Sequence, residues 1–158
     1  LIPEIPYDIR RVCYKVRRRQ AAGRFFSIVV VAEGAFPVGG SQTFIEPGVQ
    51  GGLPRLGGAA HDVAQGIAEI TGLETRVTVL GHLLRGGTPS SFDRLLATRY
   101  GSAAIELAAR DRWGRMVALH GTRISDVPIE DAIGQLKRVD PQGEILRAAR
   151  AMGIEFGG

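Results

Sequence analysis

The spacing of apolar residues divides the first half of the chain into helical and extended stretches. After Asp8, apolar residues recur at intervals of three and four, which predicts a helix that Asp8 caps and Gly23 ends. Phe25–Ala32 is apolar at every position except Ser27, as in a strand that is buried on both faces of a parallel sheet. Another helix is predicted over Ala59–Thr71, and another strand over Thr75–Leu80. A helix followed by a buried strand is half of a βαβ pattern.

The second half of the chain predicts three more helices and a strand pair. Helices are expected over Ser91–Arg110, from Pro128 to Lys137, and from Asp140 to Gly153, and the strands over Met116–His120 and Arg123–Val127. Between the predicted strand over Phe25–Ala32 and the predicted helix over Ala59–Thr71, the segment Gly34–Gly58 carries eight glycines and three prolines and is expected to be a loop. The predicted fold class is therefore α/β, with a mainly parallel sheet flanked by helices and a small strand pair near residues 115–127.

Composition narrows the classes of function. The chain has 158 residues and a net charge of +4, much of it in one basic stretch: Arg10, Arg11, Lys15, Arg17, Arg18 and Arg19. No zinc spacing, helix-turn-helix pattern or aromatic-interleaved strand supports a nucleic-acid surface. A solvated helix face or an anion-contacting subunit surface is favoured instead. The longest apolar run, Ile28–Ala32, is too short to cross a bilayer.

The single cysteine and the isolated histidines carry no predicted chemistry. Cys13 excludes an internal disulfide framework, suits a reducing compartment, and is expected to be a buried helix residue. Neither His61 nor His120 has a partner at metal-ligand spacing. The sequence therefore predicts no metal site within this chain.

Candidate chemistry gathers where the strand over Thr75–Leu80 ends. Arg76 lies at the front of that strand, and His82 and Arg85 follow it. Ser90-x-x-Asp93 is a capping-box pattern that opens the next helix. In α/β folds ligands bind at this edge of the sheet, and arginine forks and helix N-termini favour phosphate or carboxylate. Spacing alone is equally compatible with a solvated strand end that carries incidental arginines.

The run Arg76-Val-Thr-Val-Leu-Gly-His82-Leu-Leu-Arg85-Gly-Gly-Thr-Pro-Ser-Ser-Phe-Asp-Arg94 resembles the sugar-phosphate-binding segment of the phosphofructokinases. The chain departs from the family pattern at Leu84, where the family usually has Gln; the cationic residues are kept. The resemblance continues through Ser27-Ile-Val-Val-Val-Ala-Glu-Gly and the final helices, so it covers essentially the whole chain. It implies that residues 1–158 are the C-terminal half of such an enzyme.

The resemblance also implies an activity and a division of roles. The parent enzyme would transfer a phosphoryl group from ATP or pyrophosphate to the 1-hydroxyl of fructose 6-phosphate in glycolysis, with Mg²⁺ and the catalytic loop in the missing N-terminal half. His82 and Arg85 would hold the 6-phosphate within one subunit. Arg76 would reach the 6-phosphate of a neighbouring subunit in a cytoplasmic homotetramer, and Glu33 would accept from sugar hydroxyls. No catalytic residue is expected in this chain, which alone would be inactive.

Three further expectations concern organisation and regulation. Residues 1–85 would belong mostly to the sugar-phosphate-binding lobe, 86–127 to the neighbouring lobe, and 128–158 to C-terminal helices. Arg24 remains where the family has basic effector-binding residues, but Ala22 stands where a cation is common, so effector binding is not expected to follow the family pattern. The alternative reading is a non-catalytic sugar-phosphate-binding or assembly module that keeps Arg76, His82 and Arg85.

Overall fold

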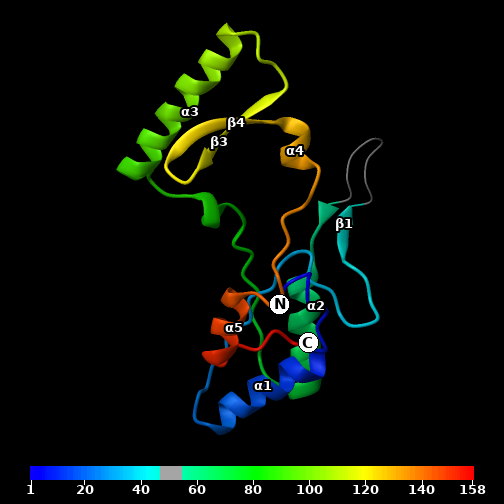
Figure 1. Ribbon diagram of the computed structural model, residues 1–158. Helices are drawn as coiled ribbons and strands as arrows, with labels where there is room; N and C mark the ends of the chain where they lie inside the picture. Colours follow the sequence, from blue (N-terminus) through cyan, green and yellow to red (C-terminus); the bar gives the residue numbers. More distant parts are fainter. Residues whose placement is uncertain (47–54) are drawn as a thin grey trace. The chain divides into compact units, whose positions relative to one another are not determined.

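The computed structural model describes residues 1–46 and 55–158, which fall into two compact units (Figure 1). Unit 1 contains Leu1–Val79 and Arg138–Gly158, and unit 2 contains Leu80–Lys137. The functional lobes expected over residues 1–85, 86–127 and 128–158 stay a prediction. The boundary between Val79 and Leu80 places Glu33 and Arg76 in unit 1, and His82 and Arg85 in unit 2.

Three helices form most of the regular structure of unit 1: α1 over Ile9–Ala21, α2 over Ala59–Thr71 and α5 over Glu144–Ala151. The Asp8 carboxylate accepts from the backbone N–H of Arg10 at 2.8 Å, so the predicted cap of α1 is confirmed. Helix α2 ends at Gly72 with a φ of 71°, a left-handed conformation that glycine adopts at little cost. The last helix begins later than the sequence predicts, because Asp140 and the residues after it form a turn.

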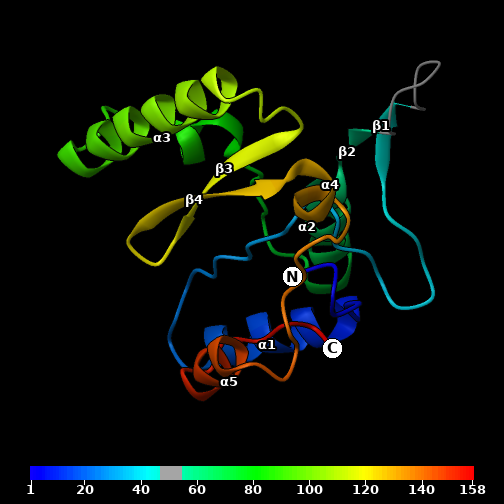
Figure 2. The same ribbon diagram turned by 45° about the horizontal axis from the view of Figure 1, so that its top comes forward.

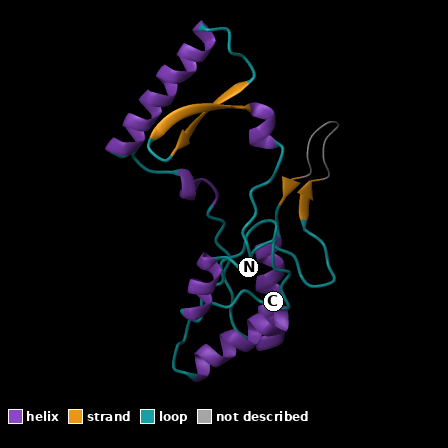
Figure 3. Ribbon diagram, in the orientation of Figure 1, coloured by secondary structure: helices purple, strands orange, loops and turns teal. Residues whose placement is uncertain are grey.

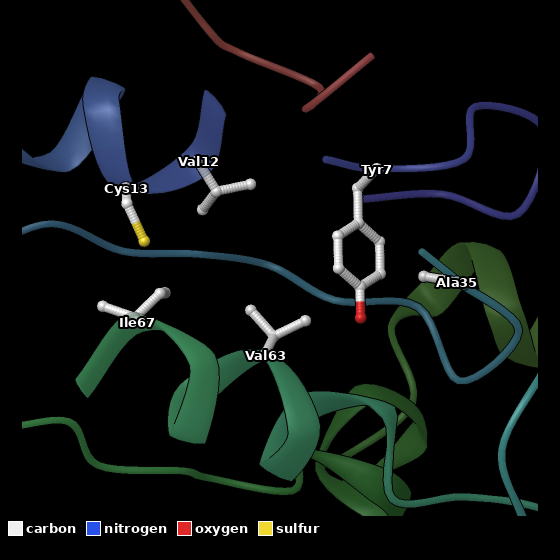
Figure 4. Close-up of a cluster of buried hydrophobic side chains, with 6 residues drawn as sticks. All are labelled: Tyr7, Val12, Cys13, Ala35, Val63 and Ile67. Atoms are coloured by element: carbon white, nitrogen blue, oxygen red, sulfur yellow. The ribbon is translucent and has the colours of Figure 1, made fainter. Parts of the chain in front are cut away.

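The core of unit 1 lies between α1 and α2 (Figure 4). Six side chains form it, from both helices and the segments beside them: Tyr7, Val12, Cys13, Ala35, Val63 and Ile67. The helices approach closely at Gly66, where an added Cβ would lie 2.9 Å from Cγ1 of Ile9. Burial is the largest cause that raises the pKa of the Cys13 thiol, and the prediction of a buried, structural cysteine is confirmed.

The two strands predicted for a parallel sheet are extended segments without a strand partner in the described part of the chain (Figure 3). Val29 and Val31 pack against the core, but Ile28 and Val30 are 81% and 71% exposed, so burial on both faces is wrong for Phe25–Ala32. Leu1 alone pairs with this segment: its N–H donates to the Val30 carbonyl, and its carbonyl accepts from the Ala32 N–H. A strand needs a backbone neighbour for its hydrogen bonds. Besides the contact with Leu1, the described residues supply side-chain hydrogen bonds from Arg19 to the Phe26 carbonyl and the Ser27 hydroxyl, and no neighbouring strand.

The second extended segment shows the same alternation. Leu73, Thr75 and Val77 are half-buried, whereas the residues between them are exposed. The Thr75 hydroxyl donates to the Ala64 carbonyl on α2 at 3.3 Å, which fixes this face of the segment against the helix. The mixed α/β class is thus confirmed, but the parallel sheet is not assembled within the described residues.

Part of the predicted glycine-rich loop is ordered as a small antiparallel pair, β1 over Phe44–Glu46 and β2 over Arg55–Leu56. The sequence analysis missed both strands. Residues 47–54 of the expected loop lie outside the described residues, so the expectation stays untested there.

Unit 2 is built around a hairpin. Strands β3, over Arg115–His120, and β4, over Arg123–Pro128, pair antiparallel, which confirms the predicted strand pair. The 19-residue helix α3, over Ser91–Ala109, contacts the hairpin, and a short helix α4, over Ile129–Ile133, follows it. Helix α4 ends before the predicted Lys137. None of the helices in the described ranges is long and apolar enough to cross a membrane.

Candidate functional site

His82 and Arg85 lie together on η1, a 3₁₀ helix over Gly81–Arg85 that begins unit 2. The Leu83 N–H donates to the Leu80 carbonyl at 2.8 Å, which closes its first turn. Residues three apart on a 3₁₀ helix project from the same side, so both side chains share one face of η1. Both are exposed, and neither forms a hydrogen bond or ion pair with another side chain that the structure describes. An imidazole and a guanidinium are therefore available to contact an anion together, since neither has a partner among the described residues.

A glycine pair carries the chain away from η1. Gly87 has a φ of 108°, a conformation that a residue with a side chain would adopt only with strain. A Cβ on Gly86 would lie 3.3 Å from the carbonyl oxygen of His82. The pair thus lets the backbone turn tightly beside His82 and Arg85 without placing side chains over them.

The N-terminus of α3 is closed by its own side chains. The Ser90 hydroxyl accepts from the Asp93 N–H at 3.2 Å, and the Asp93 carboxylate accepts from the Ser90 N–H at 2.8 Å. These two bonds form the predicted capping box. The backbone hydrogen bond from Ser90, followed by that from its hydroxyl, lowers the pKa of Asp93 below its ordinary value. A carboxylate already occupies this helix end, so phosphate recognition here would depend on His82 and Arg85.

Arg76 lies on the second extended segment of unit 1 and pairs locally. Its guanidinium contacts the Glu74 carboxylate at 2.9 Å, and the side chains of Arg76 and Glu74 are 86% and 76% exposed. Ion pairs this exposed contribute about 0–1 kcal/mol. Arg76 could therefore leave Glu74 and bind another anion with little loss of free energy.

Glu33 lies in the turn that ends the first extended segment of unit 1. Its carboxylate is exposed and accepts no hydrogen bond from the described residues. Glu33 and Arg76 thus belong to unit 1, whereas His82 and Arg85 belong to unit 2. The structure brings together His82 and Arg85, and the roles of all four residues stay predictions.

Sequence reasoning found these cations but missed the 3₁₀ helix that presents two of them. A five-residue helix has too few apolar positions to show a period, so the chain gave no signal for it. The capping box at Ser90 was visible because its two polar residues are three apart in the sequence.

The described residues contain no group of three or more His, Cys, Asp or Glu side chains that could hold a metal ion. His120 instead lies 3.2 Å from the Ser125 hydroxyl, measured from its Nδ1 atom, on the paired strands of the hairpin.

The chain is similar in sequence to several proteins of known function. The chain is 53% identical over 99% of its length to the ATP-dependent 6-phosphofructokinase of Chloroflexus aggregans. It is 45% identical to ATP-dependent 6-phosphofructokinase 2 of Clostridium perfringens over 99% of its length, and 45% identical to the Mycobacterium leprae enzyme over 97%. It spans 42%, 43% and 45% of these three relatives, respectively. The family model described as Phosphofructokinase matches residues 1–108, which include Glu33, η1 and most of α3, and the chain therefore belongs to the phosphofructokinase family.

Proposed function

We propose that this chain supplies the sugar-phosphate-binding part of a 6-phosphofructokinase that phosphorylates fructose 6-phosphate at its 1-hydroxyl. The observation that carries the proposal is that His82 and Arg85 share one face of η1 without a partner among the described residues, within the segment that the family model matches. A phosphate monoester accepts hydrogen bonds from several directions, and a guanidinium donates two parallel ones. One face that presents an imidazole and a guanidinium therefore suits a sugar phosphate.

The remaining roles come from the resemblance to the phosphofructokinases, and the chemistry of each side chain fits them. Arg76 is proposed to contact the 6-phosphate bound by a neighbouring subunit of a homo-oligomer, after it exchanges its exposed contact with Glu74. Glu33 is proposed to accept from hydroxyls of the sugar, since a carboxylate has no proton to donate and the hydroxyls do. Charge complementarity thus assigns cations to the phosphate and the carboxylate to the sugar ring.

ATP is the proposed phosphoryl donor, because the relatives in C. aggregans and C. perfringens are ATP-dependent 6-phosphofructokinases. The chain spans 42% of the C. aggregans relative, so the donor site, the Mg²⁺ ligands and the groups that activate the sugar hydroxyl are proposed to lie in the rest of a longer enzyme. That remaining part is also the proposed partner of the exposed face of the extended segments. Phosphoryl transfer depends mainly on positioning and charge stabilisation, and this chain would position the acceptor.

The test is steady-state kinetics on the full-length enzyme with Arg85→Ala. Loss of a charge-assisted hydrogen bond of about 1.5–3 kcal/mol predicts a rise of about 10- to 100-fold in the KM for fructose 6-phosphate. The KM for ATP should stay nearly constant. Arg85→Lys should recover part of the loss, because an ammonium keeps the charge but cannot donate two parallel bonds.

Arg110→Ala is the matched control, since it removes an arginine from the same unit at the other end of α3. Among the described residues, the one ion-pair partner of the Arg110 side chain is Glu106, at 3.7 Å. This variant should leave both KM values unchanged. An unchanged sugar-phosphate KM in Arg85→Ala, or a rise confined to the ATP KM, would refute the assignment. A non-catalytic module would differ from an enzyme by binding fructose 6-phosphate without turnover in the full-length protein.

A further inference from the structure

A second concentration of positive charge lines a cavity in unit 1, which does not contain His82 or Arg85. The cavity has a volume of about 350 Å³ and lies between α1, α5 and the segment after α5. Figure 2 shows α5 beside α1, with the C-terminal segment running next to both. Arg11 and Lys15 line the cavity from α1, Arg150 from α5, and Phe156 from the C-terminal segment. Elements far apart in the sequence thus place three cationic residues around one hollow.

These cations have little compensation from carboxylates. Arg11 and Lys15 are four residues apart on α1, a spacing at which like charges repel each other. None of the three cationic side chains forms an ion pair within the described part of the chain. Glu155 is the one acidic side chain in the lining, and its carboxylate accepts from the Gly157 N–H at 3.2 Å. Among the side chains that line the cavity, three positive charges therefore face one negative charge.

The arginine from α5 is held in place before any ligand arrives. Its Nη1 donates to the Pro141 carbonyl at 2.9 Å, and its guanidinium carbon lies 5.5 Å from the centre of the Phe156 ring. Stacking on an aromatic face and one fixed hydrogen bond leave other N–H groups of Arg150 available. Less side-chain entropy is then lost when an anion binds, because the guanidinium is already oriented.

We propose that this cavity is an anion-binding site for a small phosphate-bearing molecule, separate from the sugar-phosphate site. A volume of about 350 Å³ is within the range of small-molecule sites and exceeds what a single phosphate group fills. Arginine forks and a lysine ammonium are the side chains that proteins use for phosphate. Two residues of the basic stretch on α1, Arg11 and Lys15, would contact the bound phosphate.

Chemical protection of Lys15 tests the proposal with a local readout. The chain has two lysines, and Lys137 lies in the other unit, outside the cavity, so it serves as an internal control. The full-length enzyme is acetylated with and without inorganic phosphate at constant ionic strength set by sodium chloride. Peptide mass spectrometry then gives the modification rate of each lysine. Phosphate should slow the modification of Lys15 and leave that of Lys137 unchanged.

Two variants that each remove one positive charge test whether the protection of Lys15 arises from phosphate bound in this cavity. Arg11→Gln and Arg150→Gln should each raise the phosphate concentration that half-protects Lys15 by about tenfold, as expected for one lost charge-assisted hydrogen bond. Arg150 stacks on Phe156 of the C-terminal segment, whereas the Arg11 side chain makes no hydrogen bond with another described residue. Arg11→Gln therefore tests binding without disturbing that packing contact. Arg85→Ala should leave the protection of Lys15 unchanged, which keeps this inference distinguishable from the proposed function.

Several outcomes would overturn the site. Equal Lys15 modification with phosphate and with sodium chloride alone would mean that only ionic screening acts there. Protection that persists at the same phosphate concentration in both glutamine variants would place the phosphate elsewhere. A Lys15 amine that does not react even without phosphate would contradict an open cavity.

Discussion

At the scale of single residues, the polar groups of the candidate site are positioned by neighbours in the sequence. Arg76 contacts Glu74, two residues away, and Asp93 contacts Ser90, three residues away. Such contacts form as soon as the local backbone is in place, so they orient side chains without help from distant elements. His82 and Arg85 lack even these contacts among the described residues, which leaves their side-chain nitrogen atoms for a ligand.

The capping carboxylate Asp93 predicts a pH dependence at the start of α3. Two hydrogen bonds from Ser90 favour the charged form and hold the pKa of Asp93 below its ordinary value. A lowered pKa means that the stabilisation is present at neutral pH and is lost as the pH falls through the folded-state pKa of Asp93. Carbon-detected NMR titration of the aspartate side chains should therefore give Asp93 a pKa below that of an unstructured aspartate.

Ser90→Ala provides the decisive comparison for this titration. The variant removes the hydroxyl but keeps the backbone N–H of position 90, which is the larger cause of the shift. The pKa of Asp93 should thus rise toward its ordinary value without reaching it. An unshifted pKa in the parent chain would show that the capping box does not persist in solution.

At the scale of elements, helices were predictable from the sequence and paired strands only in part. The period of α1 and the Asp8 cap are local signals, and they gave the right helix. The apolar run Phe25–Ala32 carried a strand signal of equal strength, but a strand exists only with a partner, and the residues able to pair with it are not among its sequence neighbours. The β3–β4 hairpin was predicted correctly because one short turn joins the two strands that pair.

The candidate site shows the same limit. Its cations were identified from a continuous motif that includes His82 and Arg85. The second cluster was not, because Arg150 lines the same cavity as Arg11 and Lys15 only after the chain has folded. Residues that converge through tertiary structure leave no spacing for a sequence pattern to reveal.

The contact between α1 and α2 can be tested with two isoleucines of α2. Ile67 is 5% exposed and belongs to the core, whereas Ile70 is 43% exposed. Ile67→Ala should lower the local stability by about 2–5 kcal/mol through lost burial and the cavity left behind. Ile70→Ala removes the same atoms and should cost much less. Native-state hydrogen exchange of α1 and α2 amides measures both effects, and equal losses would place the core elsewhere.

In unit 2, the hairpin has a charged cluster that predicts a second stability difference. Asp126 on β4 pairs with Arg115 on β3 and with Arg112 at 3.1 Å, and its side chain is only 22% exposed. Asp126→Asn should weaken the hairpin by about 1–2 kcal/mol, since a half-buried carboxylate with two cationic partners is lost.

Glu106→Gln on α3 is the control for the charge removed from Asp126. Glu106 is 63% exposed and lies 3.7 Å from its single partner, Arg110, so its loss should change stability by less than about 0.5 kcal/mol. Hydrogen exchange of the β3 and β4 amides should separate the two variants. A hairpin that is unaffected by Asp126→Asn would mean that main-chain pairing alone holds it.

At the scale of the whole molecule, each extended segment has one face on the helices and one face open. Phe25, Phe26 and Ile28 are 89%, 74% and 81% exposed, and the backbone from Phe25 to Val29 pairs with no strand in the described ranges. From Glu74 to Val79 the backbone likewise forms no hydrogen bond with another backbone group that the structure describes. Apolar side chains next to unpaired strand edges are the surface that further strands cover.

The open edge predicts that the 158-residue chain self-associates in solution. Analytical ultracentrifugation should show oligomers whose proportion rises with concentration, because one exposed segment can pair with another. Ile28→Lys should reduce this association, since a charged side chain disfavours edge pairing. Ile145→Lys is the matched control: Ile145 is 82% exposed, against 81% for Ile28, but α5 satisfies its own backbone hydrogen bonds. A monomer at all concentrations would refute the prediction, whereas an equal effect of both lysines would assign association to general hydrophobicity instead of to the open edge.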